Sequence, residues 1–384
     1  MKFITFFHAC HGLRSLAFLT LNLFSLGALA APTEITHCSQ VVTTDAVMTS
    51  DLVCRPGIYE AIAIEINASN ITLDMGGYIL SGDAFGIGVR AMDVEGVKIK
   101  DGTIENFLSG LDLVRAPGAT VEGLTIRNLE IDDPDNFVPG MRIVRSQNVL
   151  VKDCFFEMLP VAHKEMIVMA SSQATITNNE FKNGSVGVNV SRDGDLGSIG
   201  SIASVINNHF IGVTIAGVLV QFTENVRIAN NEFTQCEMGV MADLHADLGD
   251  ASLSDITIEG NHMHDGYIGI HFMGITDSGI LRNTIRDNWR GIFIDSTMGC
   301  PEPPTPECIF SSDNLVSGNI TLGNFIDLFH REEAVGNTWF ERVEWEDSSD
   351  TRRWPSCGRF ATDTATEPTS WTGRDFRAER FIQR

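Results

Sequence analysis

The chain has 384 residues, of which 43% are hydrophobic, and its formal net charge is −23 at pH 7. This length suffices for one large domain or two ordinary ones. Nucleic acids and anionic membranes are disfavoured as partners, because an acidic surface repels them.

Residues 1–30 have the features of an export signal. Lys2 and Arg14 precede the apolar run 16–29, and Ala28-Leu29-Ala30 is a small-x-small cleavage site. The run is short for a membrane span and no further span follows it. We therefore predict a secreted or periplasmic mature protein without a membrane span, with a retained anchor as the alternative. Without Lys2 and Arg14, 25 basic residues face 50 acidic ones, a net charge of −25.

Seven cysteines follow the predicted signal, and export permits disulfides. Close spacing favours two pairs, Cys38 with Cys54 and Cys300 with Cys308. An odd count leaves at least one cysteine unpaired, and the spacing matches no structural zinc site. Two cysteines at strand-like positions are predicted to be buried thiols: Cys154 and Cys236.

A short pattern recurs along the chain: apolar–polar alternation, then asparagine, then another apolar residue. Two copies are "QATITNNEF" (173–181) and "NVRIANNEF" (225–233). The period varies around 25 residues, as expected for a coil whose loops differ in length while its strands do not. We interpret the asparagine as a corner residue that tolerates a left-handed turn and hydrogen-bonds along the coil axis. The aligned copies are Asn179, Asn208, Asn231, Asn261, Asn283, Asn319 and Asn337.

A second series alternates with the first and begins each time with glycine. "GVNVS" (187–191), "GVLVQ" (217–221) and "GIHFM" (269–273) are examples. Period-two alternation after glycine predicts short, half-buried strands. Stacking such coils in parallel register would bury one continuous apolar column.

Together with the opening "CSQVVTTDAVMTSDLVC", these patterns resemble right-handed parallel β-helix proteins of the pectin-lyase-like superfamily over residues 36–341. The opening is similar to that of bacterial proteins with a NosD-like β-helix domain. The predicted fold is all-β, a right-handed single-stranded parallel β-helix of about eleven rungs with an asparagine ladder. The predicted parts are a signal peptide (1–30), a disulfide-pinned N-terminal cap (31–66), the β-helix (67–341) and an aromatic, arginine-rich C-terminal cap or tail (342–384).

One outward stripe gathers histidines and acids on neighbouring coils. Side chains one rung apart can converge on a metal ion, whereas alternating charges also suit a solvated sheet face. Both interpretations stay open for His209, Glu232, His262 and His264.

The outward face of the glycine-initiated strands is mixed and flanked by long loops, which predicts a groove for a chain molecule such as a polysaccharide. The resemblance implies uronate lyase or epimerase chemistry, or glycoside hydrolysis, in such a groove. A lyase or epimerase must neutralise a sugar carboxylate, remove the adjacent proton and supply an acid. Motifs of the individual enzymes are missing: "DDPDN" (132–136), for example, lacks the histidine of the DPHD motif of mannuronan epimerases.

Candidates for each role come from this face. Arg142, Gln221 or a Ca²⁺ ion held by Asp243 and Asp295 would neutralise the carboxylate. These two acids lie two rungs, about 10 Å, apart, just beyond the inverting-hydrolase range. The candidate bases are Lys164 and His271, the candidate acid is Tyr267, and the candidate substrate-binding residues are Asn189, Arg192, Gln221 and Phe293.

Two functions therefore remain open. The first is an exported carbohydrate-active protein, a polysaccharide lyase or epimerase rather than a hydrolase. The second is a non-catalytic β-helix that binds glycans or partners or serves a structural role in the envelope.

Overall fold

The computed structural model describes residues 31–55, 62–128, 139–160, 164–192, 199–243, 253–296, 308–330 and 336–340. The predicted signal peptide, the tail 342–384, Cys300 and "DDPDN" lie outside these ranges. The chain divides into two units, Met1–Ala31 and Pro32–Arg384, and every strand belongs to the second. The described residues form strands and no helix, so none of them belongs to a helix that could cross a membrane.

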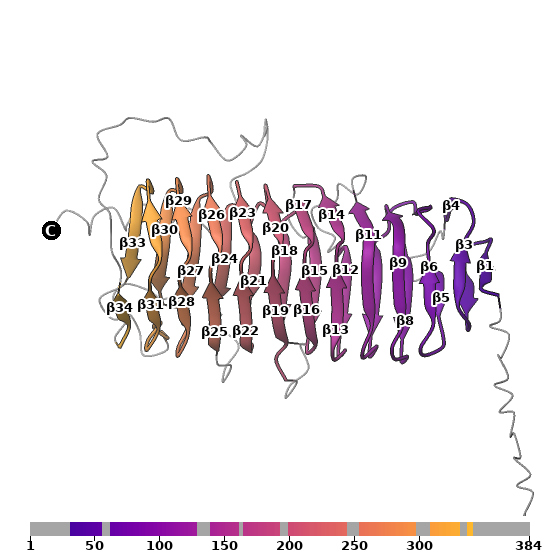
Figure 1. Cartoon of the computed structure of the whole chain (residues 1–384), viewed down its shortest axis with the longest axis horizontal. Coiled ribbons are helices and arrows are strands. Elements are labelled where there is room, and N and C mark those ends of the chain that lie inside the picture. The colour runs from indigo at the N-terminus through magenta and orange to yellow at the C-terminus, as the bar shows by residue number, and fades with distance from the viewer. Residues whose placement is uncertain are drawn as a thin grey trace, which may run out of the picture. The chain divides into compact units, whose positions relative to one another are not determined.

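The glycine-initiated segments form one sheet of twelve parallel strands, called sheet B here (Figure 1). A glycine at the start of most of these strands lets the preceding corner approach the backbone of the next rung. A Cβ at Gly187, for example, would lie 2.5 Å from the Gly217 carbonyl oxygen. The strands are β2 (Gln40–Val42), β5 (Ile62–Ile66), β8 (Ile87–Met92), β10 (Ser109–Val114), β12 (Met141–Val144), β15 (Glu165–Ala170), β18 (Val186–Ser191), β21 (Ala216–Val220), β24 (Met238–Asp243), β27 (Ile268–Met273), β30 (Arg290–Asp295) and β33 (Ile326–His330).

The other 22 strands form sheet A, which contains two strand columns joined by the long strands β9 (Lys98–Glu105) and β11 (Thr120–Asn128). One column also holds β1 (Thr33–Ile35), β3 (Ala46–Met48), β6 (Thr72–Asp74), β13 (Val149–Lys152), β16 (Gln173–Thr177), β19 (Ile202–Ile206), β22 (Glu224–Ala229), β25 (Ser254–Glu259), β28 (Gly279–Leu281), β31 (Leu315–Ser317) and β34 (Thr338–Phe340). The second holds β4 (Leu52–Val53), β7 (Ile79–Ser81), β14 (Phe155–Met158), β17 (Glu180–Asn183), β20 (His209–Ile211), β23 (Glu232–Thr234), β26 (His262–His264), β29 (Thr284–Arg286) and β32 (Ile320–Leu322).

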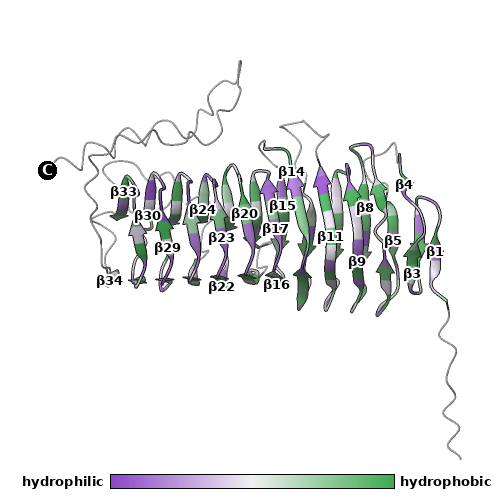
Figure 2. Cartoon of the chain, turned by 45° about the horizontal axis from the view of Figure 1, so that its top comes forward, coloured by the Kyte–Doolittle hydropathy of each residue, from purple (hydrophilic) through white to green (hydrophobic). Residues whose placement is uncertain are grey.

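Strand alternation creates the core inside the coil. In β22, Val226 and Ile228 are buried while Arg227 between them is exposed, and hydrophobic and hydrophilic stretches share the same strands throughout (Figure 2). Equivalent inward positions on successive rungs stack identical side chains. The rings of Phe156, Phe181, Phe210 and Phe233 follow one another with centroids 5.0, 4.7 and 4.7 Å apart. The all-β parallel coil predicted from the sequence is thus confirmed.

The asparagine ladder is also present. Asn208 donates from its backbone N and from Nδ2 to Asn231 Oδ1 over 2.9 and 3.1 Å. Asn231 repeats both bonds to Asn261 over 2.9 and 3.0 Å. The ladder runs from Asn179 to Asn319. Asn337 was wrongly assigned to it, since Asn337 accepts from Asn314 at a different corner.

The left-handed turn belongs to the residue before each ladder position. Asn178, Asn207 and Asn230 have φ angles of 56°, 57° and 54°, whereas the ladder asparagines that follow them are not in this region. Two neighbouring residues therefore divide the two tasks that the sequence interpretation gave to one. The first makes the turn and the second hydrogen-bonds along the axis.

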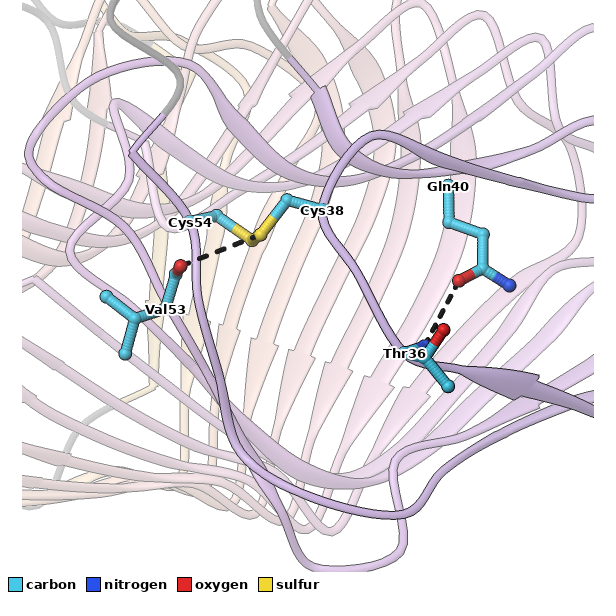
Figure 3. The surroundings of a disulfide bond; sticks show 5 residues. All are labelled: Thr36, Cys38, Gln40, Val53 and Cys54. Atoms are coloured by element: carbon cyan, nitrogen blue, oxygen red, sulfur yellow. Dashed lines mark hydrogen bonds between the residues drawn. A yellow bond between two sulfur atoms is a disulfide. The ribbon is translucent and has the colours of Figure 1, made fainter.

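The N-terminal disulfide is confirmed. Cys38 and Cys54 are bonded with Cα atoms 5.6 Å apart (Figure 3). The segment between them contributes β2, β3 and β4, so the predicted cap already takes part in both sheets. Cys308 is disulfide-bonded, and its predicted partner Cys300 lies outside the described residues. Cys154 and Cys236 are buried thiols outside the disulfides, as predicted.

Candidate functional site

The outward side chains of sheet B form columns with one residue per rung. In the central column, each residue lies beside its neighbour on the next strand in parallel register. The column contains Glu65, Arg90, Asp112, Arg142, Val168, Asn189, Leu219, Met241, His271, Phe293 and Phe329. Its N-terminal half is polar and its C-terminal half is apolar.

The polar half is built around a buried ion pair. Arg142 Nε donates to Asp112 Oδ1 over 2.8 Å, and Arg142 Nη2 donates to Asp112 Oδ2. The Asp112 side chain is 1% exposed and the Arg142 side chain 39%. Ser109 Oγ donates to the same carboxylate. The Arg142 guanidinium therefore binds a protein carboxylate through two hydrogen bonds, and these N–H groups do not point to a ligand.

Further polar groups continue this surface over β15, β18 and the end of β21. Asn189 Nδ2 donates to Glu165 Oε2 over 3.0 Å, and burial raises the pKa of the Glu165 carboxyl. The Arg192 guanidinium lies over the Phe222 ring, 5.6 Å from its centroid. We define the polar patch as the half-buried or paired side chains Arg90, Asp112, Arg142, Glu165, Asn189, Ser191, Arg192 and Gln221.

The apolar half was missed by sequence reasoning. Its side chains point away from the core, yet they are buried and pack together as a second hydrophobic cluster. Tyr267 and Phe329 pack against it. We call this set the outer hydrophobic cluster: Val186, Ala216, Leu219, Met238, Met241, Ile268, Met273 and Phe293.

His271 lies within this apolar surrounding. It is 7% exposed, and its ring contacts Phe293 with centroids 4.6 Å apart. Both ring nitrogens are buried, and neither has a hydrogen-bond partner among the described residues. Burial, and then the nearby Arg290 charge, lower the pKa of His271 to about 3. The imidazole is thus neutral at pH 7 and a weak base.

Three aromatic rings stack at the corner before these strands. Tyr267 and Trp289 have centroids 4.6 Å apart and Trp289 and Phe325 6.4 Å, and all three planes are close to parallel. The Arg290 guanidinium lies 4.0 Å from the Trp289 centroid. The stack stabilises the corner, and its end ring, Phe325, is 59% exposed.

The structure brings together some of the predicted site residues and separates others. Asn189 is half-buried in β18 and Gln221 is half-buried directly after β21, and Arg192 directly follows the end of β18. By contrast, Arg142 and His271 are five strands apart, about 24 Å at the usual strand spacing. They cannot act on the same sugar unit.

The remaining candidates are also dispersed. Lys164, the other predicted base, is fully buried beside the start of β15. Tyr267, the predicted acid, is in the aromatic stack, and Phe293 belongs to the outer hydrophobic cluster. The catalytic roles given to Arg142, Lys164, His271 and Tyr267 stay predictions.

Asp243 and Asp295 lie two strands apart, with Met273 between them in the register. Asp243 is fully buried, and Asp295 Oδ1 accepts from the Ser296 backbone over 2.7 Å. A calcium ion needs six to eight oxygen ligands, which the described residues alone do not gather here. A calcium role for these two acids stays a prediction. On sheet A, by contrast, the donor atoms of Glu232, His262 and His264 do lie together.

Two family models match the chain. "Right handed beta helix region" matches residues 197–338, and "Periplasmic copper-binding protein (NosD)" matches residues 66–247. No curated protein matches the chain in sequence.

Several solved structures share the fold. The surface protein and adhesin PfbA of Streptococcus pneumoniae is 12% identical, with a TM-score of 0.51 over 80% of this chain and 89% of that chain. The A-module of the Azotobacter vinelandii mannuronan C-5 epimerase AlgE6 is 13% identical, with a TM-score of 0.46 over 77% and 90%. The catalytic domain of a GH87 α-1,3-glucanase, in complex with nigerose, is 12% identical, with a TM-score of 0.45 over 75% and 63%. Together with the stacked parallel strands and the asparagine ladder, the family matches identify the chain as a right-handed parallel β-helix protein.

Proposed function

We propose that the protein is exported and binds a neutral glycan chain along the polar patch of sheet B, without cleaving it. Export is supported by residues 1–30 and by the likeness of residues 66–247 to a family described as periplasmic. The observation that carries the binding proposal is the polar patch itself. Its groups repeat at the strand spacing of about 4.8 Å, close to the length of one pyranose unit.

The charges of the patch favour a neutral ligand. Within a chain of net charge −23, the three arginines of the patch face three acids, when Glu65, the partner of Arg90, is counted with Asp112 and Glu165. Arg90 is held by Glu65 over 2.8 Å, as Arg142 is by Asp112. A polyuronate would meet an acidic protein with few uncommitted cations here, whereas hydroxyl groups can bond to amides and ion pairs without a charge penalty.

The same geometry argues against lyase or epimerase chemistry. These reactions need a neutraliser, a base and an acid at one sugar unit. The predicted neutraliser Arg142 is engaged by Asp112, and the predicted base His271 is five strands away with a depressed pKa. Glycan binding requires only the polar patch, whereas catalysis also requires a neutraliser, a base and an acid at one sugar unit. Binding therefore fits the arrangement better.

Affinity electrophoresis tests the proposal. Purified protein would be run in gels containing neutral glucans, mannans or galactans, and in gels containing alginate or pectate. We expect retardation by at least one neutral polymer. Asn189→Ala and Gln221→Ala should each weaken binding about tenfold, the cost of one lost hydrogen bond of about 1.4 kcal/mol. Gln173→Ala on β16 of sheet A is the matched control and should bind like the wild type.

Two results would overturn the proposal. One is the absence of retardation by every neutral polymer. The other is retardation by polyuronates alone. If the polyuronate also gains the ultraviolet absorbance of an unsaturated sugar, or changes its uronate composition, the lyase or epimerase hypothesis replaces the binding proposal.

A further inference from the structure

Three adjacent strands of sheet A place histidines around one carboxylate. The register pairs His209 of β20 with Glu232 of β23 and Glu232 with His262 of β26, while His264 lies opposite Thr234. Residues between these positions point inward and are buried, namely Phe210, Phe233 and Met263. Strand alternation therefore holds all the donor side chains on the outward face.

The donor atoms are close to a ligand arrangement. One donor atom each from Glu232, His262 and His264 lie within 4.8 Å of one another. His264 Nε2 is 3.4 Å from Glu232 Oε1, and His209 Nε2 is 4.0 Å from Glu232 Oε2. Tetrahedral Zn²⁺ with bonds of about 2.1 Å holds its ligand atoms about 3.4 Å apart. Rotations of the exposed Glu232 side chain and of the partly buried His262 and His264 side chains would bring the donor atoms to this separation.

A carboxylate behind His264 is the independent sign of a metal ligand. His264 Nδ1 lies 2.7 Å from Asp265 Oδ2. In the tautomer with the proton on Nδ1, His264 donates to this carboxylate and its Nε2 lone pair lies on the side of Glu232. Metal-binding histidines commonly have such a partner, which fixes the tautomer and orients the ring.

The alternative is an ordinary ladder of ion pairs, and the neighbouring rungs show what that looks like. Arg127 pairs with Glu105 over 2.7 Å, and Lys182 pairs with Glu157 over 2.8 Å. These pairs use permanent cations in the same strand column. Around Glu232, imidazoles replace lysine and arginine, and imidazole is a metal ligand first and only a weak cation at neutral pH.

We propose that Glu232, His262 and His264, with His209 as fourth ligand, bind a divalent late-transition-metal ion of the Zn²⁺ class. Imidazole and carboxylate donors select such ions over Ca²⁺ and Mg²⁺, which prefer all-oxygen sites. His262 and His264 lie beyond the segment 66–247 that matches the NosD model. The other two proposed ligands, His209 and Glu232, lie within that segment.

Arg286 is the competitor of the metal ion. Its Nε donates to His262 Nε2 over 3.1 Å, and its Nη1 lies 3.3 Å from Asp287 Oδ2. Metal binding would displace this guanidinium from His262 toward Asp287. Arg286 therefore weakens the site through its charge and through its hydrogen bond.

Titration calorimetry of the tag-free protein with Zn²⁺ tests the proposal, with Co²⁺ absorption to report the coordination geometry. We expect one ion per chain, a tetrahedral Co²⁺ spectrum, and no binding of Mg²⁺ at the same concentration. The double variant His262→Ala/His264→Ala should lose the site. Asp265→Asn should weaken it about 10- to 100-fold, and Arg286→Gln should strengthen it. His37→Ala, which removes an exposed histidine elsewhere, is the matched control.

Zn²⁺ binding that is absent from the wild type, or that persists in the double variant at equal affinity, would overturn the proposal. Binding that Arg286→Gln leaves unchanged or weakens would contradict the position of the ion beside Arg286. Circular dichroism and the melting temperature without metal show whether each variant is folded, so a lost site is distinguished from a lost fold.

Discussion

Arg142 binds Asp112 with a forked pair of hydrogen bonds across two neighbouring strands, and the carboxylate is almost completely buried. Removing one partner of a buried pair leaves an uncompensated charge. Arg142→Met should therefore lower the free energy of unfolding by about 3–5 kcal/mol, measured by urea denaturation. The double variant Asp112→Leu/Arg142→Met should recover most of this loss, because no buried charge remains.

The matched control is Arg90→Met. Arg90 pairs with Glu65, whose side chain is 36% exposed, whereas the Asp112 side chain is 1% exposed. Arg90→Met should therefore lower the free energy of unfolding by less than about 1 kcal/mol. If Arg142→Met lowered the stability no more than Arg90→Met does, Arg142 would be available to a ligand and would have no structural role.

His271 predicts an acid-dependent loss of stability. Burial lowers the pKa of His271 from 6.5 to about 3. Between pH 6.5 and pH 3, His271 is therefore protonated in the unfolded chain and neutral in the folded chain. Stability contributed by the neutral ring is complete above pH 6.5 and is lost as the pH falls toward 3. In this window His271 alone adds a slope of about 1.4 kcal/mol per pH unit.

His271→Leu should remove this slope, because leucine matches the surrounding apolar side chains and does not titrate. The measurement is urea unfolding at several pH values between 6.5 and 3. His37→Leu, at an exposed position, should retain the wild-type profile. A wild-type slope in His271→Leu would show that the ring is protonated in the folded protein.

Neighbouring asparagines should respond in opposite ways to substitution. Asn231 accepts two hydrogen bonds from Asn208 and donates to Asn261 and to the Val205 carbonyl. Asn231→Ala leaves several buried groups unsatisfied and should cost about 2–4 kcal/mol. Asn230 is exposed and has a φ of 54°, so Asn230→Gly should be neutral or slightly stabilising. Thermal unfolding of both variants measures the contrast, and equal losses would refute the division of tasks between the two residues.

The repeat predicted the coil because its signals are local. Alternation sets which side chains face the core, and a recurring buried asparagine requires partners on both sides. The disulfide followed from short spacing. The sequence prediction for Arg142 considered the ligand alone and did not include Asp112, which lies beside Arg142 on the neighbouring strand. Neighbours across a sheet compete with substrates for a charged side chain.

The outer hydrophobic cluster could not be predicted in the same way. Leu219, Met241 and Phe293 occupy outward positions of apolar strands, and alternation does not distinguish two faces when both are apolar. Because His271 is buried beside this cluster, its pKa is lowered and its imidazole is a weak base, whereas a catalytic base must accept a proton readily. Burial depends on what packs over a position, and this information is not contained in the period of the strand.

Cys154 should be inert in the folded protein. Its side chain is buried, and burial raises the pKa of its thiol to about 12, so little thiolate exists at pH 8 and reagents have no access to it. Labelling with a disulfide reagent should give the same stoichiometry for the native wild type and native Cys154→Ala. In denaturant the wild type should gain one thiol over the variant. A difference between the native proteins would mean that the coil opens at this rung on the labelling timescale, because only exposure can restore a normal thiol pKa.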